Sequence, residues 1–220
     1  YLGGKLYDIE GIGYEPQGGI IFEGNRIEAA SAPDLVYAAK LACGLANARV
    51  MLASDSNQWR VAGDPTEAAM LVFAQKMNWQ KAKLLASDPI ISELPFDYNL
   101  KYHALISGTS KPVLSVVGAP EVVLKLTNKI RLNGKNQILK DDARENLEVV
   151  FADLSRQGLR VVALAEATTS AKVVSPENIG GLTFIGFLAM KDALRPEVAS
   201  AMVRAKEAGI RVVMITGDHK

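Results

Sequence analysis

The sequence predicts an α+β fold in which an antiparallel sheet is flanked by helices. Two observations carry this prediction. Extended apolar segments at residues 102–107 and 113–117 flank a Gly-Thr-Ser-Lys turn, which indicates a β-hairpin. Segments 31–46 and 64–77 place apolar residues at helical spacing, which indicates a pair of helices. The order therefore mixes antiparallel strands with paired helices.

Short alternating runs at residues 6–10 and 19–23 predict two strands, separated by a turn at 15–18. The second predicted helix has a clear beginning, because Asp64 suits the N-cap and Pro65 suits the first helical position. Residues 140–158 predict a further helix, and residues 159–166 and 182–190 predict two apolar strands.

The last part of the chain differs in kind. Residues 196–208 predict a helix that Gly209 ends, and the apolar run 210–215 is typical of a buried parallel strand. This run leads into Thr216, Gly217 and Asp218, so the segment resembles the start of an α/β phosphate site. One helix and one strand cannot cover both faces of a sheet. We therefore expect one domain at residues 1–191 and an incomplete second unit at 192–220.

The composition is that of an ordinary globular protein, with 49% hydrophobic and 22% charged residues and a net charge of +1. Such a balance argues against a disordered tail, a fibrous repeat and a nucleic-acid-binding surface. The single cysteine, Cys43, cannot form an internal disulfide, and no Cys/His cluster has metal-ligand spacing. This cysteine usage is typical of a reducing, cytoplasmic setting. No run of 18 or more apolar residues occurs, so no bilayer-spanning segment is expected. The start at Tyr1 suggests a piece of a longer protein.

Five segments together resemble one family. They are Gly-Asp-Pro-Thr-Glu-Ala-Ala at 63–69, Pro-Phe-Asp-Tyr-Asn-Leu-Lys at 95–101, Gly-Ala-Pro-Glu at 118–121, Asp-Ala-Leu-Arg-Pro-Glu at 192–197 and Met-Ile-Thr-Gly-Asp-His at 214–219. In this order they resemble the nucleotide-binding domain of P-type cation-transporting ATPases, in the branch of light-cation pumps such as calcium pumps. The resemblance implies ATP and Mg²⁺ as ligands, and a partial phosphorylation domain of haloacid-dehalogenase-like fold at 192–220.

The resemblance assigns several residues to the adenine end of the nucleotide. Phe96 would stack on the ring, although a core phenylalanine is the plain alternative. Glu67, with Thr66, would accept from the exocyclic amine, although a helix-start acid is also explained by the helix dipole. Gly118 and Ala119 would form a wall of the pocket, and an ordinary turn is the alternative there.

Other residues are assigned to the phosphates and to the hinge. Lys101 and Arg160 would face phosphate oxygens, with a solvated lysine and a surface salt bridge as the alternatives. Asp192 and Arg195 would lie at the hinge between the two units, where Asp192 is also a plausible N-cap. The chain departs from the family at Val117, where a lysine usually precedes the glycine.

The resemblance also indicates which part of the catalytic reaction these residues can carry out. Thr216, Gly217 and Asp218 would contact the γ-phosphate, but the Asp-Lys-Thr-Gly-Thr motif that carries the phosphorylated aspartate does not occur in the sequence. We therefore expect these 220 residues to bind ATP without hydrolysing it and to contribute no ligand to Mg²⁺. The parent protein would couple ATP hydrolysis to cation transport. Its phosphorylation, actuator and transmembrane domains would be the partners of this cytoplasmic domain of an integral membrane protein.

Two other functions remain open on the sequence. A capped phosphatase of the haloacid-dehalogenase type needs an early nucleophilic aspartate. Asp8 is the only early candidate, and no second aspartate follows it two residues later. A non-catalytic interaction module with an eroded nucleotide pocket is the other alternative, and Val117 is the feature that suggests it.

Overall fold

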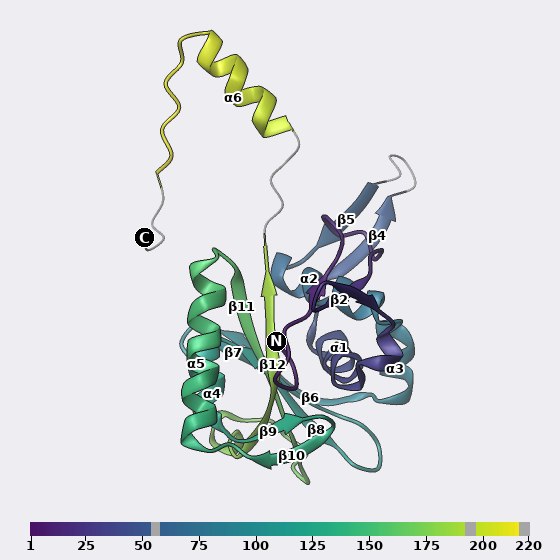
Figure 1. Ribbon diagram of the computed structural model, residues 1–220. Coiled ribbons are helices and arrows are strands. Elements are labelled where there is room, and N and C mark those ends of the chain that lie inside the picture. Colours follow the sequence, from purple (N-terminus) through teal and green to yellow (C-terminus); the bar gives the residue numbers. More distant parts are fainter. Residues whose placement is uncertain (54–57, 192–196, 216–220) are drawn as a thin grey trace.

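The computed structural model describes residues 1–53, 58–191 and 197–215 (Figure 1). Its largest element is a seven-stranded sheet with the strand order β10-β9-β12-β11-β8-β7-β6. The strands are β6 (Ile90–Asp97), β7 (Tyr102–Ser107), β8 (Val113–Gly118), β9 (Thr127–Leu132), β10 (Lys135–Ile138), β11 (Arg160–Thr168) and β12 (Leu182–Met190). All neighbours are antiparallel except β12 and β9, which are parallel. The predicted hairpin at 102–117 is confirmed as β7 and β8.

Helices cover both faces of this sheet, as Figure 1 shows. One face carries α1 (Pro33–Leu45), α2 (Pro65–Lys76) and α3 (Lys81–Ser87), and the other carries α4 (Pro120–Leu126) and α5 (Asp141–Arg156). Alternate residues of β7 therefore enter different cores: Leu105 packs with the α1 side, and Ala104 and Ile106 pack with the α4 side. Burial on both faces explains why the central strands are almost continuously apolar.

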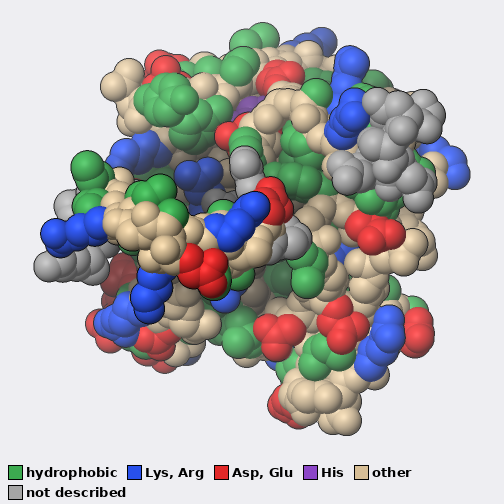
Figure 2. Space-filling view, turned by 90° about the horizontal axis from the view of Figure 1, so that it is seen from above, with side chains coloured by type: hydrophobic (Ala, Val, Ile, Leu, Met, Phe, Trp, Pro, Cys, Tyr) green, Lys and Arg blue, Asp and Glu red, His purple; other side chains and the backbone are tan. Residues whose placement is uncertain are grey.

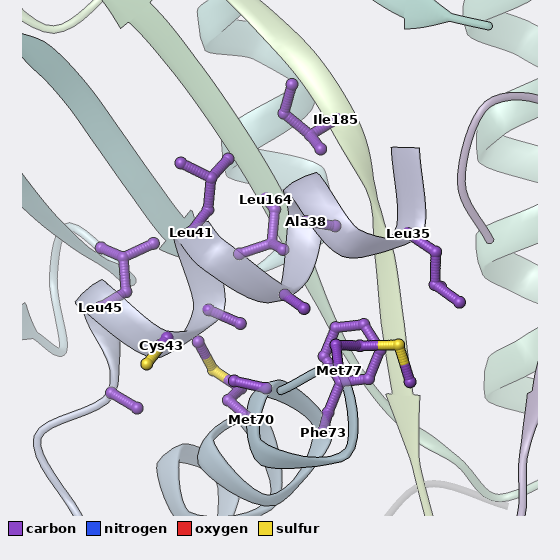
Figure 3. Close-up of a cluster of buried hydrophobic side chains, with 14 of the residues drawn as sticks. Leu35, Ala38, Leu41, Cys43, Leu45, Met70, Phe73, Met77, Leu164 and Ile185 are labelled. Atoms are coloured by element: carbon purple, nitrogen blue, oxygen red, sulfur yellow. The ribbon is translucent and has the colours of Figure 1, made fainter. Parts of the chain in front are cut away.

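Helix α1 lies between the sheet and α2 (Figure 3). Its alanines, Ala38, Ala39 and Ala42, are fully buried and let the neighbouring elements approach closely. Leu35 and Leu45 are also buried, and each such leucine stabilises the fold by roughly 1.5–3 kcal/mol. The predicted apolar stripe of this helix is thus confirmed as the centre of one core.

Two smaller sheets lie outside the main one. The first contains β1 (Asp8–Ile9), β2 (Ile20–Phe22) and β3 (Asn25–Ile27), so the strands predicted at 6–10 and 19–23 form but are shorter. The second is the hairpin of β4 (Arg49–Ala53) and β5 (Gln58–Ala62), which the sequence did not predict. Short 3-10 helices occur at Ala29–Ser31 and Pro176–Asn178.

The first two residues continue the sheet beside β12. The backbone nitrogen of Tyr1 donates to the carbonyl of Phe187 over 2.9 Å. The nitrogen of Phe187 donates back to the carbonyl of Tyr1 over 2.9 Å, and Leu2 bridges to Gly186. Tyr1 therefore lies beside Phe187, three residues before the end of β12.

The strand predicted at residues 210–215 is not formed. The preceding helix is confirmed as α6 (Glu197–Glu207), but it has no buried residue, and 210–215 have no regular secondary structure. Met214 and Ile215 are 87% and 93% exposed. In the described part of the chain no strand lies beside this segment to pair with its backbone groups, so an isolated strand has nothing to stabilise it. Among the described residues, no helix is both long and apolar enough to cross a membrane.

Candidate functional site

The strand register brings the predicted residues to one edge of the main sheet. Asp97, Tyr102, Gly118 and Ala163 lie opposite one another in a continuous row across β6, β7, β8 and β11. Because neighbouring strands run in opposite directions, β6 and β8 end at this edge and β7 and β11 begin there. The residues placed there are Phe96, Lys101, Gly118, Ala119 and Arg160. Figure 2 looks onto this edge and shows basic side chains in and beside a hollow of the surface.

Asp97 organises the turn between β6 and β7. Its Oδ1 atom accepts from the backbone nitrogens of Asn99 at 2.8 Å and Leu100 at 3.0 Å. The turn closes where the nitrogen of Lys101 donates to the carbonyl of Asp97 over 2.6 Å. Lys101 has a φ of 58°, which is a left-handed conformation that costs free energy for a residue with a side chain. Its side chain is 55% exposed, and Nζ lies 3.5 Å from Glu121 Oε1.

Gly118 sits where β7 and β8 approach most closely. A Cβ atom at this position would lie 2.6 Å from Tyr102 Cβ and 2.7 Å from Tyr102 Cα. The next residue, Ala119, donates its backbone N–H to the carbonyl of Lys101 over 2.9 Å. Glycine is therefore required by backbone packing: Gly118 is itself buried, and Ala119 beside it is partly exposed.

Phe96 is not a core residue. Its side chain is 50% exposed, and it meets the 88% exposed Tyr98 edge to face, with ring centroids 5.4 Å apart. A β-bulge between Leu94 and Asp97 breaks the regular alternation of β6 at this point. An exposed aromatic pair at the end of a strand offers a flat apolar surface to a ligand.

The beginning of α2 faces the same edge. Asp64 is its N-cap, as predicted, and Oδ1 accepts from the nitrogens of Thr66 at 2.8 Å and Glu67 at 3.2 Å. The hydroxyl of Thr66 accepts from Arg160 Nη1 at 2.9 Å, which joins α2 to the start of β11. Glu67 Oε2 accepts from the backbone nitrogen of Asn47 at 3.0 Å. Thr66 is thus joined to Arg160, and Glu67 lies next to it in the first turn of α2.

Four polar residues beside Glu67 were not predicted from the sequence. Asn47 Nδ2 donates to Glu93 Oε1 over 2.7 Å, and Lys81 Nζ donates to Asn47 Oδ1 over 3.2 Å. His103 Nε2 lies 3.0 Å from the same Glu93 oxygen, without the alignment of a hydrogen bond. Their only sequence signal is His103, a polar residue inside the apolar run of β7.

Burial governs the charge of this cluster. His103 is 2% exposed, and burial lowers the pKa of its imidazole, although the nearby carboxylates of Glu93 and Glu67 act in the opposite direction. Burial also lowers the pKa of Lys81, again against the attraction of carboxylates. Among the described residues neither ring nitrogen of His103 has an aligned hydrogen-bond partner. Burial therefore favours the neutral form of the imidazole.

Val117 is the cross-strand neighbour of His103 and is only 7% exposed. Its side chain faces the α1 core, where it packs against apolar residues. Two lysines of the same region, Lys111 and Lys125, do not take the place of a cation at position 117. Lys111 lies in the turn at the opposite end of β8, and Lys125 lies in the last turn of α4.

Hollows of the surface also occur elsewhere. One of about 120 Å³ lies between α1, α3 and the other end of β7 and β8, beside Tyr37 and Lys40. Another of about 380 Å³ lies between the first residues, α2 and β12. Neither is lined by the residues of the row, so the candidate site is an open sheet edge.

Five predicted site residues cannot be placed. Asp192, Arg195, Thr216, Gly217 and Asp218 lie outside the described residues. Within residues 1–53, 58–191 and 197–215, no three His, Cys, Asp or Glu side chains gather in a way that could hold a metal ion.

An exposed aromatic ring, two cations and a glycine at one edge of an α+β domain are features suited to a nucleotide. Comparison with known proteins gives the family. Residues 36–197 match the family model described as P-type ATPase, cytoplasmic domain N. The chain therefore belongs to the P-type ATPase family.

Named relatives agree with this membership. The cation-transporting ATPase pma1 of Synechocystis is 32% identical over 100% of this chain and 25% of its own length. A calcium-transporting ATPase of Bacillus subtilis is 30% identical with the same coverage. The sodium/potassium-transporting ATPase subunit alpha-1 of Oreochromis mossambicus is 33% identical over 80% of this chain and 19% of its own length. The chain thus spans about a quarter or less of these relatives.

Proposed function

We propose that this edge of the sheet binds ATP for a P-type cation-transporting ATPase. In this proposal, hydrolysis proceeds through an aspartyl phosphate outside these 220 residues and drives cation transport across a membrane. The observation that carries the proposal is the row from Asp97 to Ala163, which gathers Phe96, Lys101, Gly118 and Arg160 at one edge. Segments far apart in the sequence meet there, and each contributes a group suited to a nucleotide.

The adenine ring would lie against Phe96. The exposed ring offers a stacking surface, and base–aromatic stacking is worth roughly 1–3 kcal/mol per base. Gly118 and Ala119 permit close approach of the base, because neither carries a large side chain. Glu67 would accept from the exocyclic amine: its Oε2 atom already accepts from Asn47, and Oε1 accepts no hydrogen bond within the described residues.

The phosphates would lie toward Lys101 and Arg160. The Lys101 side chain is 55% exposed, and Glu121 at 3.5 Å holds its ammonium group only loosely. Arg160 donates one N–H to the hydroxyl of Thr66, and the other N–H groups of its guanidinium can bind phosphate oxygens. Both cations are exposed and can reach a ligand without breaking a buried contact.

Mg²⁺ would arrive with the ATP. The described residues contain no cluster of acids that could hold the ion, so phosphate oxygens would be its ligands at this edge. When bound, Mg²⁺ neutralises phosphate charge. Lys101 and Arg160 would orient the phosphate chain. The γ-phosphate contacts of Thr216, Gly217 and Asp218, and the hinge role of Asp192 and Arg195, stay proposals.

The rest of the protein would supply the remaining parts. Because the chain spans 25% of the Synechocystis relative, a phosphorylation domain, an actuator domain and transmembrane helices are the proposed partners. Within that protein this domain would lie on the cytoplasmic side. The capped-phosphatase alternative gains no support, because Asp8 lies on the two-residue strand β1 of an antiparallel sheet rather than at the end of a parallel strand.

Calorimetric titration of MgATP into the 220-residue chain tests the proposal. We expect weak binding, with a Kd of roughly 0.1–5 mM, and no release of phosphate. Phe96→Ala should weaken binding at least about fivefold, because the stacking surface is lost. Ile138→Ala is the matched control, since Ile138 is 76% exposed on β10 and away from the site. Absence of binding by the wild-type chain would favour an interaction module, and steady phosphate release would contradict the proposed division of labour.

A further inference from the structure

Asn47 joins three separate elements through its backbone N–H and the two polar atoms of its side-chain amide. Its backbone N–H donates to Glu67 Oε2 at the start of α2 over 3.0 Å. Its Nδ2 donates to Glu93 Oε1 on β6 over 2.7 Å, and its Oδ1 accepts from Lys81 Nζ at the start of α3 over 3.2 Å. Asn47 itself lies in the connection between α1 and β4.

Among the described residues, Glu67, Glu93 and Lys81 make no direct hydrogen bond or ion pair with one another; each is tied to Asn47. Removing the Asn47 side chain would free the Glu93 carboxylate and one contact of Lys81, whereas the backbone N–H would still hold Glu67. Lys81 also donates to the carbonyl of Ala46, so the ammonium is fixed to the same connection. The cluster is only partly buried, and the Glu93 side chain is 29% exposed, so a ligand at the sheet edge can reach it.

We propose that Asn47 is the positioning residue of this site: its side chain fixes the orientation of the Glu93 carboxylate, and its backbone N–H fixes that of Glu67. The inference rests on the proposed function, because Glu67 is the group expected to meet the base. Asn47 leaves Oε1 of Glu67 as the acceptor for a ligand donor. By occupying Glu93 Oε1, it also keeps that carboxylate from turning fully onto His103.

Two readouts test this positioning, and one of them needs no nucleotide. The first is the pKa of His103, followed by NMR in the ligand-free 220-residue chain and assigned with His103→Gln. The groups that face His103 are Glu93, Glu67 and Lys81. In Asn47→Ala, Glu93 loses its competing donor and can turn onto the imidazole, so the pKa of His103 should rise. Asn136→Ala, on the exposed edge strand β10, should leave it unchanged.

The second readout is the affinity for MgATP in two variants, Asn47→Asp and Asn47→Asp combined with Glu93→Gln. The double variant exchanges the hydrogen-bond donor and acceptor between the two positions. Asn47→Asp places a carboxylate against Glu93 and should weaken binding roughly three- to tenfold. Adding Glu93→Gln restores one hydrogen bond with its direction reversed, since the amide donates to the new carboxylate. The double variant should recover most of the lost affinity for MgATP, whereas Asn136→Asp should leave the affinity unchanged. A role in stability alone would lower the melting temperature without this rescue.

The outcomes separate the two proposals. If the pKa of His103 is the same in Asn47→Ala and wild type, and the double variant binds no better than Asn47→Asp, the positioning role of Asn47 is overturned. If the pKa of His103 responds as expected but the wild-type chain binds no MgATP, the Asn47 side chain positions Glu93 and the proposed ligand is wrong.

Discussion

The guanidinium of Arg160 donates from Nη1 to the hydroxyl of Thr66 over 2.9 Å, across 94 residues of sequence. This bond ties the start of β11 to the first turn of α2, so it connects the proposed phosphate end of the site with its adenine end. Both side chains are at least partly exposed, and such a bond contributes at most about 1 kcal/mol to stability.

Substitutions at Arg160 and Thr66 should separate two roles of Arg160: holding α2 in place and binding the phosphates of the nucleotide. Arg160→Met should weaken MgATP binding roughly tenfold, because a charge-assisted phosphate contact is lost. Thr66→Val removes only the hydroxyl and should change the Kd by less than about threefold. Calorimetry on both variants measures this. Equal losses would mean that Arg160 acts by holding α2 and does not touch phosphate.

Asp64→Ala should destabilise the domain by roughly 1–2 kcal/mol, because two N–H groups at the start of α2 lose their acceptor. For a domain of this size, that is a fall in Tm of about 2–8 °C. Asp64→Asn keeps an acceptor oxygen and should lose much less. Urea unfolding followed by circular dichroism checks both values, and equal losses would show that the charge matters more than the cap.

Gly118→Ala should destabilise the fold by about 1–3 kcal/mol, since the new Cβ would meet the backbone and Cβ of Tyr102. Gly180→Ala is the matched control, because nothing lies within 4 Å of a Cβ there. The control should be neutral or slightly stabilising. The comparison requires only unfolding curves, and a neutral Gly118→Ala would mean that β7 and β8 can separate at this point without cost.

Lys101→Gly should move stability and binding differently. Glycine accepts the φ of 58° without strain, so the free energy of unfolding should change by less than about 1 kcal/mol. Binding of MgATP should weaken several-fold, because the ammonium group is gone. Lys135→Gly, on exposed β10, controls for the loss of one surface lysine in a strand. A binding loss in both variants would point to overall charge and not to this site.

His103 should make the domain sensitive to mild acid. Its pKa in the folded state lies below the ordinary value of 6.5, so the unfolded chain takes up the proton more readily. The stability that the neutral imidazole contributes is fully present above pH 6.5. It is lost as the pH falls from there toward the folded-state pKa. His103→Gln should therefore flatten the stability profile in this window, as measured by urea unfolding at several pH values.

Glu166 opposes this trend. Burial raises the pKa of its carboxyl above the ordinary 4.5, so its folded form holds the proton longer than the unfolded form does. That contribution is present at low pH and is lost as the pH rises through the folded-state pKa. In His103→Gln, a residual fall in stability with rising pH would be the signature of Glu166, and the double variant with Glu166→Gln should lose it.

The elements of this domain could largely be predicted from local pattern, whereas the composition of the site could not. The start of α2 was predictable because Asp64 and Pro65 carry their own capping signal. The row from Asp97 to Ala163 depends on which strands pair and in which register, and alternation within one strand does not contain that information. Only the family motifs indicated that Phe96 and Arg160 meet at one edge.

Asn47 shows why the rest was missed. It lies in a connection with no repeating pattern, and its partners come from α2, α3 and β6. The error at 210–215 has the opposite cause. An apolar run predicts a strand only when a neighbouring strand is there to accept its backbone hydrogen bonds, and the described residues provide none.

The pairing of Tyr1 with Phe187 has a consequence for protein engineering. Because Tyr1 pairs with Phe187 near the end of β12, the two ends of the segment 1–190 lie close together on the same side of the domain. Such a unit could be spliced into a surface loop of an unrelated host protein without forcing the two ends of that loop apart. The entropic cost of closing the junction would be small, and a fluorescent or enzymatic host could report nucleotide binding directly.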